Sequence, residues 1–208
     1  VTMGQAREIL TRSTRLEELL PTALTDLARS QAGFTITLKD FLALRAGETT
    51  DPVAPFLEPE QPLASGEAGE VQGVKLGGTM IFKNDRAVAI LDEKTTRGLM
   101  WLRQELRRGI VVVPCPDDES KLLTMNITRT SRKFKPRIED GKISVTIEID
   151  AEGDLIEQQC LEDLTKPEMV KSIERRTAQD IRDRVFDALE VAKRAKVDPF
   201  EMGEAVRR

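Results

Sequence analysis

The C-terminal stretch from Pro167 to Asp198 constrains the fold more than any other part of the chain. Its apolar positions recur every three or four residues, which is typical of a helix with one buried face: Val170, Ile173, Thr177, Ile181, Val185, Ala188 and Ala192. Thr165 or Lys166 can cap this helix, Pro167 fits its first turn, and Asp198-Pro199 ends it. A helix of about seven turns would cross a small domain from end to end.

The clearest strand signals in the chain come from two alternating segments. Apolar residues occupy every second position in both: Leu123, Met125 and Ile127 in one, and Ile143, Val145, Ile147 and Ile149 in the other. Glu139–Lys142 reads as the turn between them, so an antiparallel pair is predicted. Asp150–Asp154 is expected to break the second strand, with Leu155–Cys160 as a candidate continuation. Ile110–Val113 is predicted as a short buried strand.

The stretch from Leu76 to Trp101 predicts a β-hairpin that leads directly into a helix. Val74–Phe82 and Ala87–Leu91 are apolar runs joined by the polar turn Lys83–Arg86. Asp92 can cap the helix, and Gly109 is expected to end it. The apolar positions expected to face its core are Leu99, Leu102 and Leu106.

The N-terminal third is harder to assign. Arg15–Ser30 has the leucine spacing of an amphipathic helix. Phe34–Leu44 begins with strand-like alternation and loses it near Asp40, and a strand is predicted there. Gly47–Gly73 is rich in proline and glycine, which predicts an extended connection without a packed element.

These elements predict an α+β fold, with an antiparallel or mixed sheet packed against helices and a long C-terminal helix. A boundary is predicted at Gly73. Residues 1–73 would form a smaller α+β region with its connection, and residues 74–208 a sheet-plus-helix domain.

The chain lacks the residues that many catalytic mechanisms require. It contains no histidine, which excludes a Ser-His-Asp triad, a Cys-His pair and a histidine-rich zinc site. Cys115 and Cys160 are interpreted as two free thiols in preference to a disulfide. Gly73, Gly77 and Gly78 precede a strand and not a helix, so they predict close packing and not a phosphate loop. We therefore predict no catalytic, cofactor-binding or metal-binding residues, no cofactor and no enzymatic activity.

Two acidic groups could be mistaken for functional sites. Asp150, Glu152 and Asp154 surround a glycine, but their spacing does not match a calcium loop, and a solvated hairpin or bulge is favoured. Asp117–Glu119 is most simply an exposed loop. A carboxylate-based wall hydrolase is disfavoured because no acid-base pair can be singled out.

The basic segment Arg129–Arg137 is the strongest local concentration of charge. In an unbroken strand its cations would continue the apolar face of the preceding residues: Arg129, Lys133, Lys135 and Arg137. The strand must therefore leave the core near Thr128, or a bulge must shift its register. An edge strand protected by charge is favoured over contact with lipid head groups or an acidic partner. Nucleic acid is not expected, because one phenylalanine makes no stacking platform and the net charge is -4.

The hairpin and the helix after it carry motifs of a known family. The chain resembles the Ger(x)C family, the lipoprotein C subunits of spore germinant receptors. Matching residues are Phe82, Lys83, Asp85, Val88 and Leu91 in the hairpin, Thr96, Arg97, Gly98 and Trp101 in the helix, and Asp198, Phe200 and Gly203 near the end. A proline before a leucine-rich helix, at Pro21, is also similar. Thr95, Pro199 and Met202 depart from the family pattern.

The resemblance implies a function that the residues alone do not indicate. A member would be a non-enzymatic, lipid-anchored subunit on the outer surface of the spore inner membrane. It would act with the membrane-embedded A and B subunits of the receptor in nutrient-triggered germination. The N-terminal third of a typical member, with its signal peptide and lipid-bearing cysteine, has no counterpart here, so a soluble fragment is expected. The alternative is an extracytoplasmic ligand-binding module for a nutrient or a cell-wall fragment.

Overall fold

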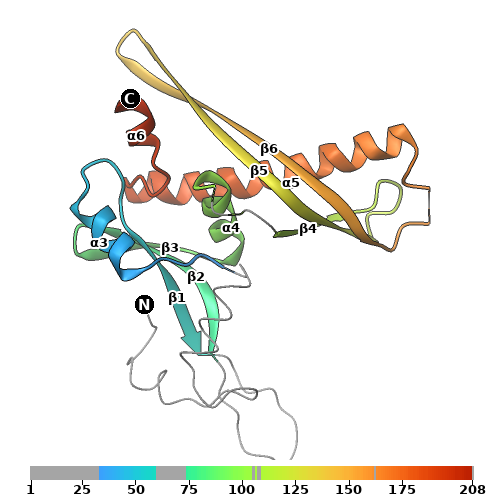
Figure 1. Ribbon diagram of the computed structural model, residues 1–208, viewed down its shortest axis with the longest axis horizontal. Coiled ribbons are helices and arrows are strands. Elements are labelled where there is room, and N and C mark those ends of the chain that lie inside the picture. Colours follow the sequence, from blue (N-terminus) through green and yellow to red (C-terminus); the bar gives the residue numbers. More distant parts are fainter. Residues whose placement is uncertain (1–32, 60–73, 105, 107–108, 162, 208) are drawn as a thin grey trace, which may run out of the picture. The chain divides into compact units, whose positions relative to one another are not determined.

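The computed structural model describes residues 33–59, 74–104, 106, 109–161 and 163–207 (Figure 1). The chain divides into two compact units, Val1–Thr96 with Val191–Pro199 and Arg97–Glu190 with Phe200–Arg208. Each contains one three-stranded antiparallel sheet. The predicted α+β class is confirmed. The helix expected at 15–30 and the boundary expected at Gly73 lie outside the described residues, and both stay predictions.

The sheet of the first unit has the strand order β1-β2-β3. It consists of β1 (Val53–Pro59), β2 (Val74–Lys83) and β3 (Arg86–Leu91). The hairpin predicted between β2 and β3 is confirmed. Asn84 adopts a φ of 56° at its turn, a left-handed conformation that asparagine tolerates better than most residues.

Strand β1 was not expected, because it lies inside the proline-rich stretch that predicted an unpacked connection. It pairs with β2 from Val53 opposite Ile81 to Pro59 opposite Val74, and Val53 and Phe56 are buried. Proline lacks the donor that an interior strand needs, but an edge strand tolerates it. Because β1 is at the edge of its sheet, Pro55 fits there.

The strand predicted at Phe34–Leu44 is wrong. Phe34 is buried, but residues from Leu38 onward form the helix α3 (Leu38–Ala46). The Thr37 side chain accepts a hydrogen bond from the Asp40 backbone N–H at 3.1 Å and thereby caps the helix. Thr37 therefore marks the change from extended to helical backbone.

Helix α4 (Glu93–Leu102) begins at the predicted cap. The Asp92 carboxylate accepts a hydrogen bond from the Thr95 backbone N–H at 2.8 Å. The helix ends before the predicted Gly109, because Gln104 adopts a φ of 57° that interrupts the helical backbone. The three predicted core leucines of this stretch are all buried, although the last lies beyond the helix: Leu99, Leu102 and Leu106.

The sheet of the second unit has the order β4-β5-β6. Its strands are β4 (Gly109–Pro114), β5 (Leu122–Glu139) and β6 (Lys142–Gln158). The predicted antiparallel pair and its turn are confirmed. Two predictions were wrong. Strand β6 continues through Asp150–Asp154 without a break, and β4 is buried on one face only, since Val111 and Val113 are buried while Ile110 and Val112 are exposed.

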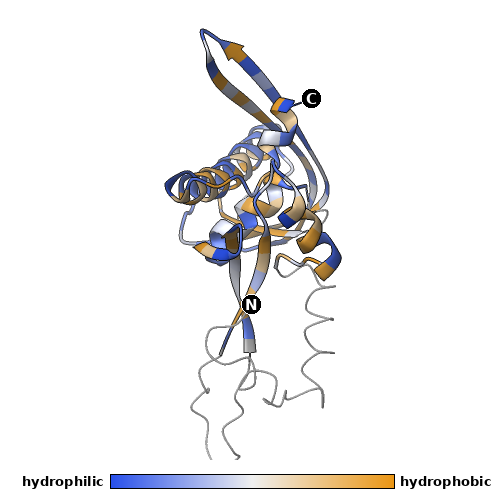
Figure 2. Ribbon diagram, turned by 90° about the vertical axis from the view of Figure 1, so that its left-hand side faces the viewer, coloured by the Kyte–Doolittle hydropathy of each residue, from blue (hydrophilic) through white to orange (hydrophobic). Residues whose placement is uncertain are grey.

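Two helices complete the described residues, the long α5 (Pro167–Ala195) and the short α6 (Met202–Arg207). The predicted long helix is confirmed with its proline in the first turn. Most of its predicted stripe is buried, and Val170 is the exposed exception. Coloured by hydropathy, α5 carries apolar and polar residues on different sides (Figure 2).

Candidate interaction surface

The hairpin residues that carry the family resemblance have structural roles in the first unit. The Lys83 ammonium donates a hydrogen bond to the Lys196 carbonyl at 2.6 Å, which ties β2 to the residue after α5. Asp85, in the turn, forms an ion pair with Arg45 at 2.5 Å. The Phe82 ring meets the Phe41 ring edge to face, with 5.4 Å between centroids. These contacts hold the hairpin against α3 and the end of α5.

The helix motif also builds the scaffold. The Thr96 hydroxyl lies 3.1 Å from that of Thr79 and donates to the Leu91 carbonyl at 3.2 Å. In the second unit, a Cβ atom on Gly98 would lie only 2.1 Å from the Arg184 carbonyl oxygen. Only glycine allows α4 and α5 to approach so closely. Trp101 is buried in the same unit.

The motif near the end of the chain also has structural roles. In the first unit the Asp198 backbone N–H donates to the Asp51 carboxylate at 2.7 Å, and the Asp51 N–H donates to the Asp198 carbonyl at 2.8 Å. Phe200, in the second unit, is buried. The residues that carry the family resemblance therefore form the framework, and the remaining elements are the candidates for an interaction surface.

The strands β5 and β6 form a long ribbon that continues past β4 (Figure 1). We use the term ribbon for residues 129–152, where β5 pairs only with β6. The pairing runs from Arg129 opposite Glu152 to Glu139 opposite Lys142. Its register shifts between Ile127 and Arg129, which leaves Thr128 as an extra residue. Of the two possibilities that the sequence left open at Thr128, the structure contains the bulge.

The bulge decides which side chains share a face, because paired residues point to the same side of an antiparallel sheet. Beyond it the predicted cationic residues no longer continue the core face. That face of the ribbon instead carries Arg132, Phe134, Pro136 and Ile138 from β5 and Ile143, Val145, Ile147 and Ile149 from β6. Sequence reasoning found the β6 half of this apolar face and missed the β5 half.

The apolar face starts at the base of the ribbon among the core of the unit. The Thr130 hydroxyl donates to the Leu106 carbonyl at 2.8 Å, and Arg132 donates to the Leu102 carbonyl. Helix α6 contacts β5 in the same unit. Toward the tip this cover ends, because Ile138 is 65% exposed and Ile143 is 60% exposed. The apolar face is therefore longer than the part that the described residues cover.

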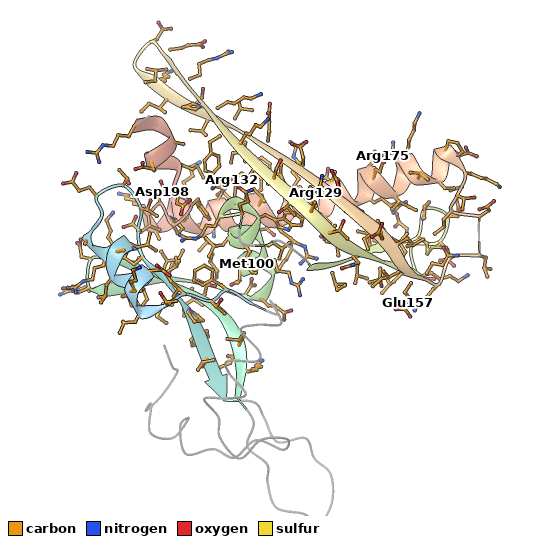
Figure 3. The ribbon with its side chains drawn as sticks, viewed as in Figure 1. Met100, Arg129, Arg132, Glu157, Arg175 and Asp198 are labelled. Carbon is orange, nitrogen blue, oxygen red and sulfur yellow. A yellow bond between two sulfur atoms is a disulfide. The ribbon has the colours of Figure 1, made fainter. Side chains whose placement is uncertain are left out.

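Arg132 is the main electrostatic feature of the base. Its guanidinium lies over the Phe134 ring, 4.2 Å from the centroid, and 3.8 Å from the Glu201 carboxylate. Glu201 also lies 3.7 Å from Arg103. Burial lowers the pKa of Arg132, but a guanidinium stays charged in proteins. Figure 3 shows Arg132 and Arg129 on β5.

The opposite face of the ribbon is charged. Arg129 pairs with Glu152 at 3.4 Å, Lys135 pairs with Glu148, and Arg137 lies 3.5 Å from Glu139. Lys133 is exposed on the same face. The predicted cluster of four cations is therefore confirmed as one face, but largely as exposed ion pairs, which contribute little to stability. The ribbon is amphipathic.

The far end of this sheet is closed by a disulfide between Cys115 and Cys160, whose Cα atoms lie 5.7 Å apart. The interpretation as two free thiols was wrong. Cys115 follows β4 and Cys160 follows β6, and the pairing of both strands with β5 brings the two residues together. Arg176 of α5 donates to the Pro116 carbonyl at 3.2 Å and pairs with Glu119, so the Asp117–Glu119 loop is partly anchored.

The carboxylates in the described part of the chain show local structural roles. Three aspartates there have a pKa below the usual value, because the hydroxyl and backbone N–H of a residue two or three positions later donate to the carboxylate: Thr95 donates to Asp92, Ser120 to Asp118 and Thr165 to Asp163. Among the residues that the structure describes, no group of three Asp, Glu or Cys side chains could hold a metal ion. This includes Asp150, Glu152 and Asp154.

Comparison with known proteins identifies the family. The family described as Spore germination B3/GerAC like, C-terminal, matches residues 77–208. The chain belongs to this family. The resemblance to germinant receptor C subunits that the sequence indicated is thereby confirmed, and the match includes α4, α5 and the ribbon.

Individual relatives agree with this assignment. The chain is 26% identical over 200 residues to the putative spore germination protein YfkR of Bacillus subtilis (strain 168), which covers 96% of this chain and 51% of the relative. It is 27% identical over 172 residues to the spore germination protein YndF of the same organism, covering 72% of this chain and 42% of the relative. The chain thus spans about half the length of these relatives.

A solved structure has the same fold. The crystal structure of the GerBC protein matches with a TM-score of 0.61 at 19% identity, over 99% of this chain and 57% of that one. In the described residues no helix has the length and apolar character that crossing a bilayer requires.

Proposed function

We propose that this chain is part of a non-enzymatic subunit of a spore germinant receptor that acts through protein-protein contacts in nutrient-triggered germination. The family match over residues 77–208 carries this proposal. The amphipathic ribbon supports it, because an exposed apolar surface on a folded domain commonly marks a contact site. The partners would be the membrane-embedded A and B subunits of the receptor.

We further propose that the full-length protein is lipid-anchored at the outer surface of the spore inner membrane. The Cys115–Cys160 disulfide supports a position outside the reducing cytosol, since disulfides persist mainly in oxidising compartments. Protease or thiol-reagent access to protoplasts of the sporulating cell would test this orientation.

The decisive experiment combines deletion with co-purification. Deleting the gene should abolish or strongly slow germination by at least one nutrient while leaving germination by non-nutrient triggers unchanged. The full-length protein should co-purify with the A and B subunits. Normal nutrient germination and intact receptor assembly in the deletion strain would refute the proposal.

Calorimetry separates this proposal from a ligand-binding module. A subunit that acts by assembly should release no heat when the folded domain is titrated with germinant nutrients. A saturable heat with one nutrient, retained after the ribbon is altered, would instead support the nutrient-binding alternative.

A further inference from the structure

Strand β6 is a long sheet edge. Its sheet has the order β4-β5-β6, so β6 pairs with β5 along one edge, and no described strand pairs with the other edge. Every residue from Asp150 to Gln158 is exposed, including Leu155 at 39% and Ile156 at 56%. The N–H and C=O groups that point outward from such an edge form a template for a further strand.

The edge of β6 lacks the usual protection against pairing. The free edge of β5 beyond the bulge carries Pro136, which has no donor. Strand β6 contains no proline, and its pairing runs without an extra residue from Lys142 to Leu155. Lysine, which often protects edge strands, occurs in β6 only at its first position. The edge is therefore open to a strand.

The second half of β6 is strongly acidic. Residues 144–158 contain five carboxylates and no lysine or arginine. The register of the strand and the extra residue Ile156 place all five on one face: Glu148, Asp150, Glu152, Asp154 and Glu157. Figure 3 shows Glu157 near the end of β6 that lies away from the turn.

The cations of β5 compensate only part of this charge. Glu148 pairs with Lys135, and Glu152 pairs with Arg129. Within the described residues, Asp150, Asp154 and Glu157 form no ion pair, and Asp150 accepts only the Ser131 hydroxyl, at 3.3 Å. The exposed strand edge thus carries a net negative charge.

Strand β5 shows what kind of strand suits β6. It places Arg129 opposite Glu152 and Lys133 opposite Glu148, with Ser131 opposite Asp150 between them. Opposite charges at directly opposed positions stabilise an antiparallel pair, and like charges destabilise it. A strand added to the other edge would face the same row of carboxylates. It would therefore need basic residues at every second position, as β5 has.

The same charge argues against two other occupants. An anionic lipid surface would repel the row of carboxylates. A second copy of this chain could offer its own β6, which would place carboxylates opposite carboxylates. The free edge of its β5 is basic, but Pro136 interrupts the donors there.

We propose that the free edge of β6, from Glu148 to Leu155, binds an extended segment of a partner protein that carries lysine or arginine at every second position. The proposal rests on the proposed function in that the partner is a protein. Backbone hydrogen bonds to the edge supply affinity, and the match between cations and carboxylates supplies specificity.

A photo-crosslinking amino acid on β6 tests the proposal in the full-length protein in its spore-forming host. Position 151 lies within the acidic segment, and position 144, its control, lies on the same strand before the first of these carboxylates. Position 151 should form a protein adduct at least about tenfold more abundantly than position 144. Mass spectrometry should place the adduct in a segment with alternating basic residues.

Paired variants test the charge. Asp150→Asn with Asp154→Asn removes two carboxylates from the edge. The control, Glu139→Gln with Asp140→Asn, removes two from the turn of the same hairpin. Only the first pair should lower the adduct at position 151, by about fivefold or more, with equal far-UV circular dichroism in both. Equal adducts in the two variants would count against the proposal.

Competing peptides test the backbone pairing. A peptide of alternating lysine and valine, added to isolated spore membranes, should suppress the adduct at position 151. Successive N–H groups of a strand point to opposite edges. Of two versions of the peptide, N-methylated at the lysines or at the valines, only one should therefore lose the competition. If both compete or neither does, the partner is not held as a strand.

Other outcomes would also overturn the proposal. These are no adduct at position 151, equal adducts at positions 151 and 144, an adduct with lipid, an adduct between two copies of this chain, or an adduct in a segment without alternating basic residues.

Failure of the proposed function would look different. If the protein co-purifies with the A and B subunits but position 151 gives no adduct, the strand-addition proposal fails and the receptor role stands. If position 151 crosslinks to a suitable segment of some other protein while co-purification fails, the binding edge stands and the receptor role fails.

Discussion

The hairpins β2–β3 and β5–β6 are both antiparallel pairs joined by a tight turn, and they differ in what surrounds them. The hairpin β2–β3 is flanked by β1 on one edge, and contacts to α3 and to Lys196 fix its turn region. The hairpin β5–β6 begins in a sheet, but beyond Arg129 no third strand from the described residues pairs with it, and its tip isoleucines are exposed. The first hairpin carries the family motif and the second carries none.

This difference separates recognition of the family from location of a surface. The residues that identify the family have structural roles, because Gly98, Lys83 and Asp198 each hold one element against another. Whether the ribbon has an exposed apolar face depends on strand register and on how far other elements cover that face. The short motifs therefore mark the framework and not the ribbon, although the family model matches both.

Removing the disulfide should give the largest loss of stability. It tests whether the sheet that carries the ribbon needs a covalent cross-link. Replacing both cysteines, Cys115→Ala with Cys160→Ala, should lower the free energy of unfolding by about 4 kcal/mol, because the bridge closes a loop with a sequence separation of 45. Urea unfolding followed by Trp101 fluorescence measures this. The wild type in reductant should lose a similar amount, and the double variant should not respond to reductant. A wild type that is insensitive to reductant would contradict the prediction.

Gly98→Val tests the close approach of α4 and α5 and should cost about 3 kcal/mol or more. The new side chain would meet the Arg184 carbonyl oxygen, to which even a Cβ atom lies at 2.1 Å, and backbone cannot move aside cheaply. The matched control is Ser144→Val on the exposed ribbon, which should change stability by no more than about 0.5 kcal/mol. Equal urea midpoints for the two variants would show that the framework and the ribbon tolerate a larger side chain equally well.

The sequence predicted those elements whose patterns are local. The helix α5, the hairpin β2–β3, the Asp92 cap and the pair β5–β6 each follow from spacing or capping within a few residues. Elements that depend on distant partners were missed. Proline in β1 argues for a loop until the chain places that strand at the edge of a sheet. The Cys115–Cys160 bridge depends on strand pairing across the sheet.

For the same reason, only the β6 half of the candidate surface could be predicted from the sequence. Alternation in β6 revealed Ile143, Val145, Ile147 and Ile149. The β5 half depends on the single extra residue Thr128, which reverses the face of every later side chain. The sequence allowed either a bulge or a departure from the core, and only the pairing distinguishes them. Exposure at the tip has no local signal, because it depends on where α6 ends.

Asp92→Ala tests how firmly the motif-bearing hairpin is joined to α4, and it should cost about 1 kcal/mol through loss of the helix cap. The pKa of Asp92 lies below its usual value because the Thr95 side chain and backbone donate to the carboxylate. The stabilisation is therefore present above the unfolded pKa, near 3.8, and is lost as the pH falls through the lower folded pKa.

Urea titrations at several pH values check this. Asp92→Asn retains an acceptor for the cap but has no titrating carboxyl. Its stability relative to the wild type should therefore rise as the pH falls below about 4. A difference between wild type and Asp92→Asn that stays constant with pH would show that the Asp92 charge does not contribute.

The smallest effect is expected at the ribbon tip, where Ile138→Thr or Ile143→Thr should change the free energy of unfolding by no more than about 0.5 kcal/mol. Each side chain is at least 60% exposed, and threonine keeps the β-branched shape that suits a strand. The control in the other hairpin is Ile81→Thr. Ile81 is fully buried in β2, so this variant loses apolar burial and buries a hydroxyl, at a cost of at least about 2 kcal/mol. If the tip variants proved as costly as Ile81→Thr in urea unfolding, the apolar face would already be covered in the free protein. The contrast between the two hairpins would then disappear.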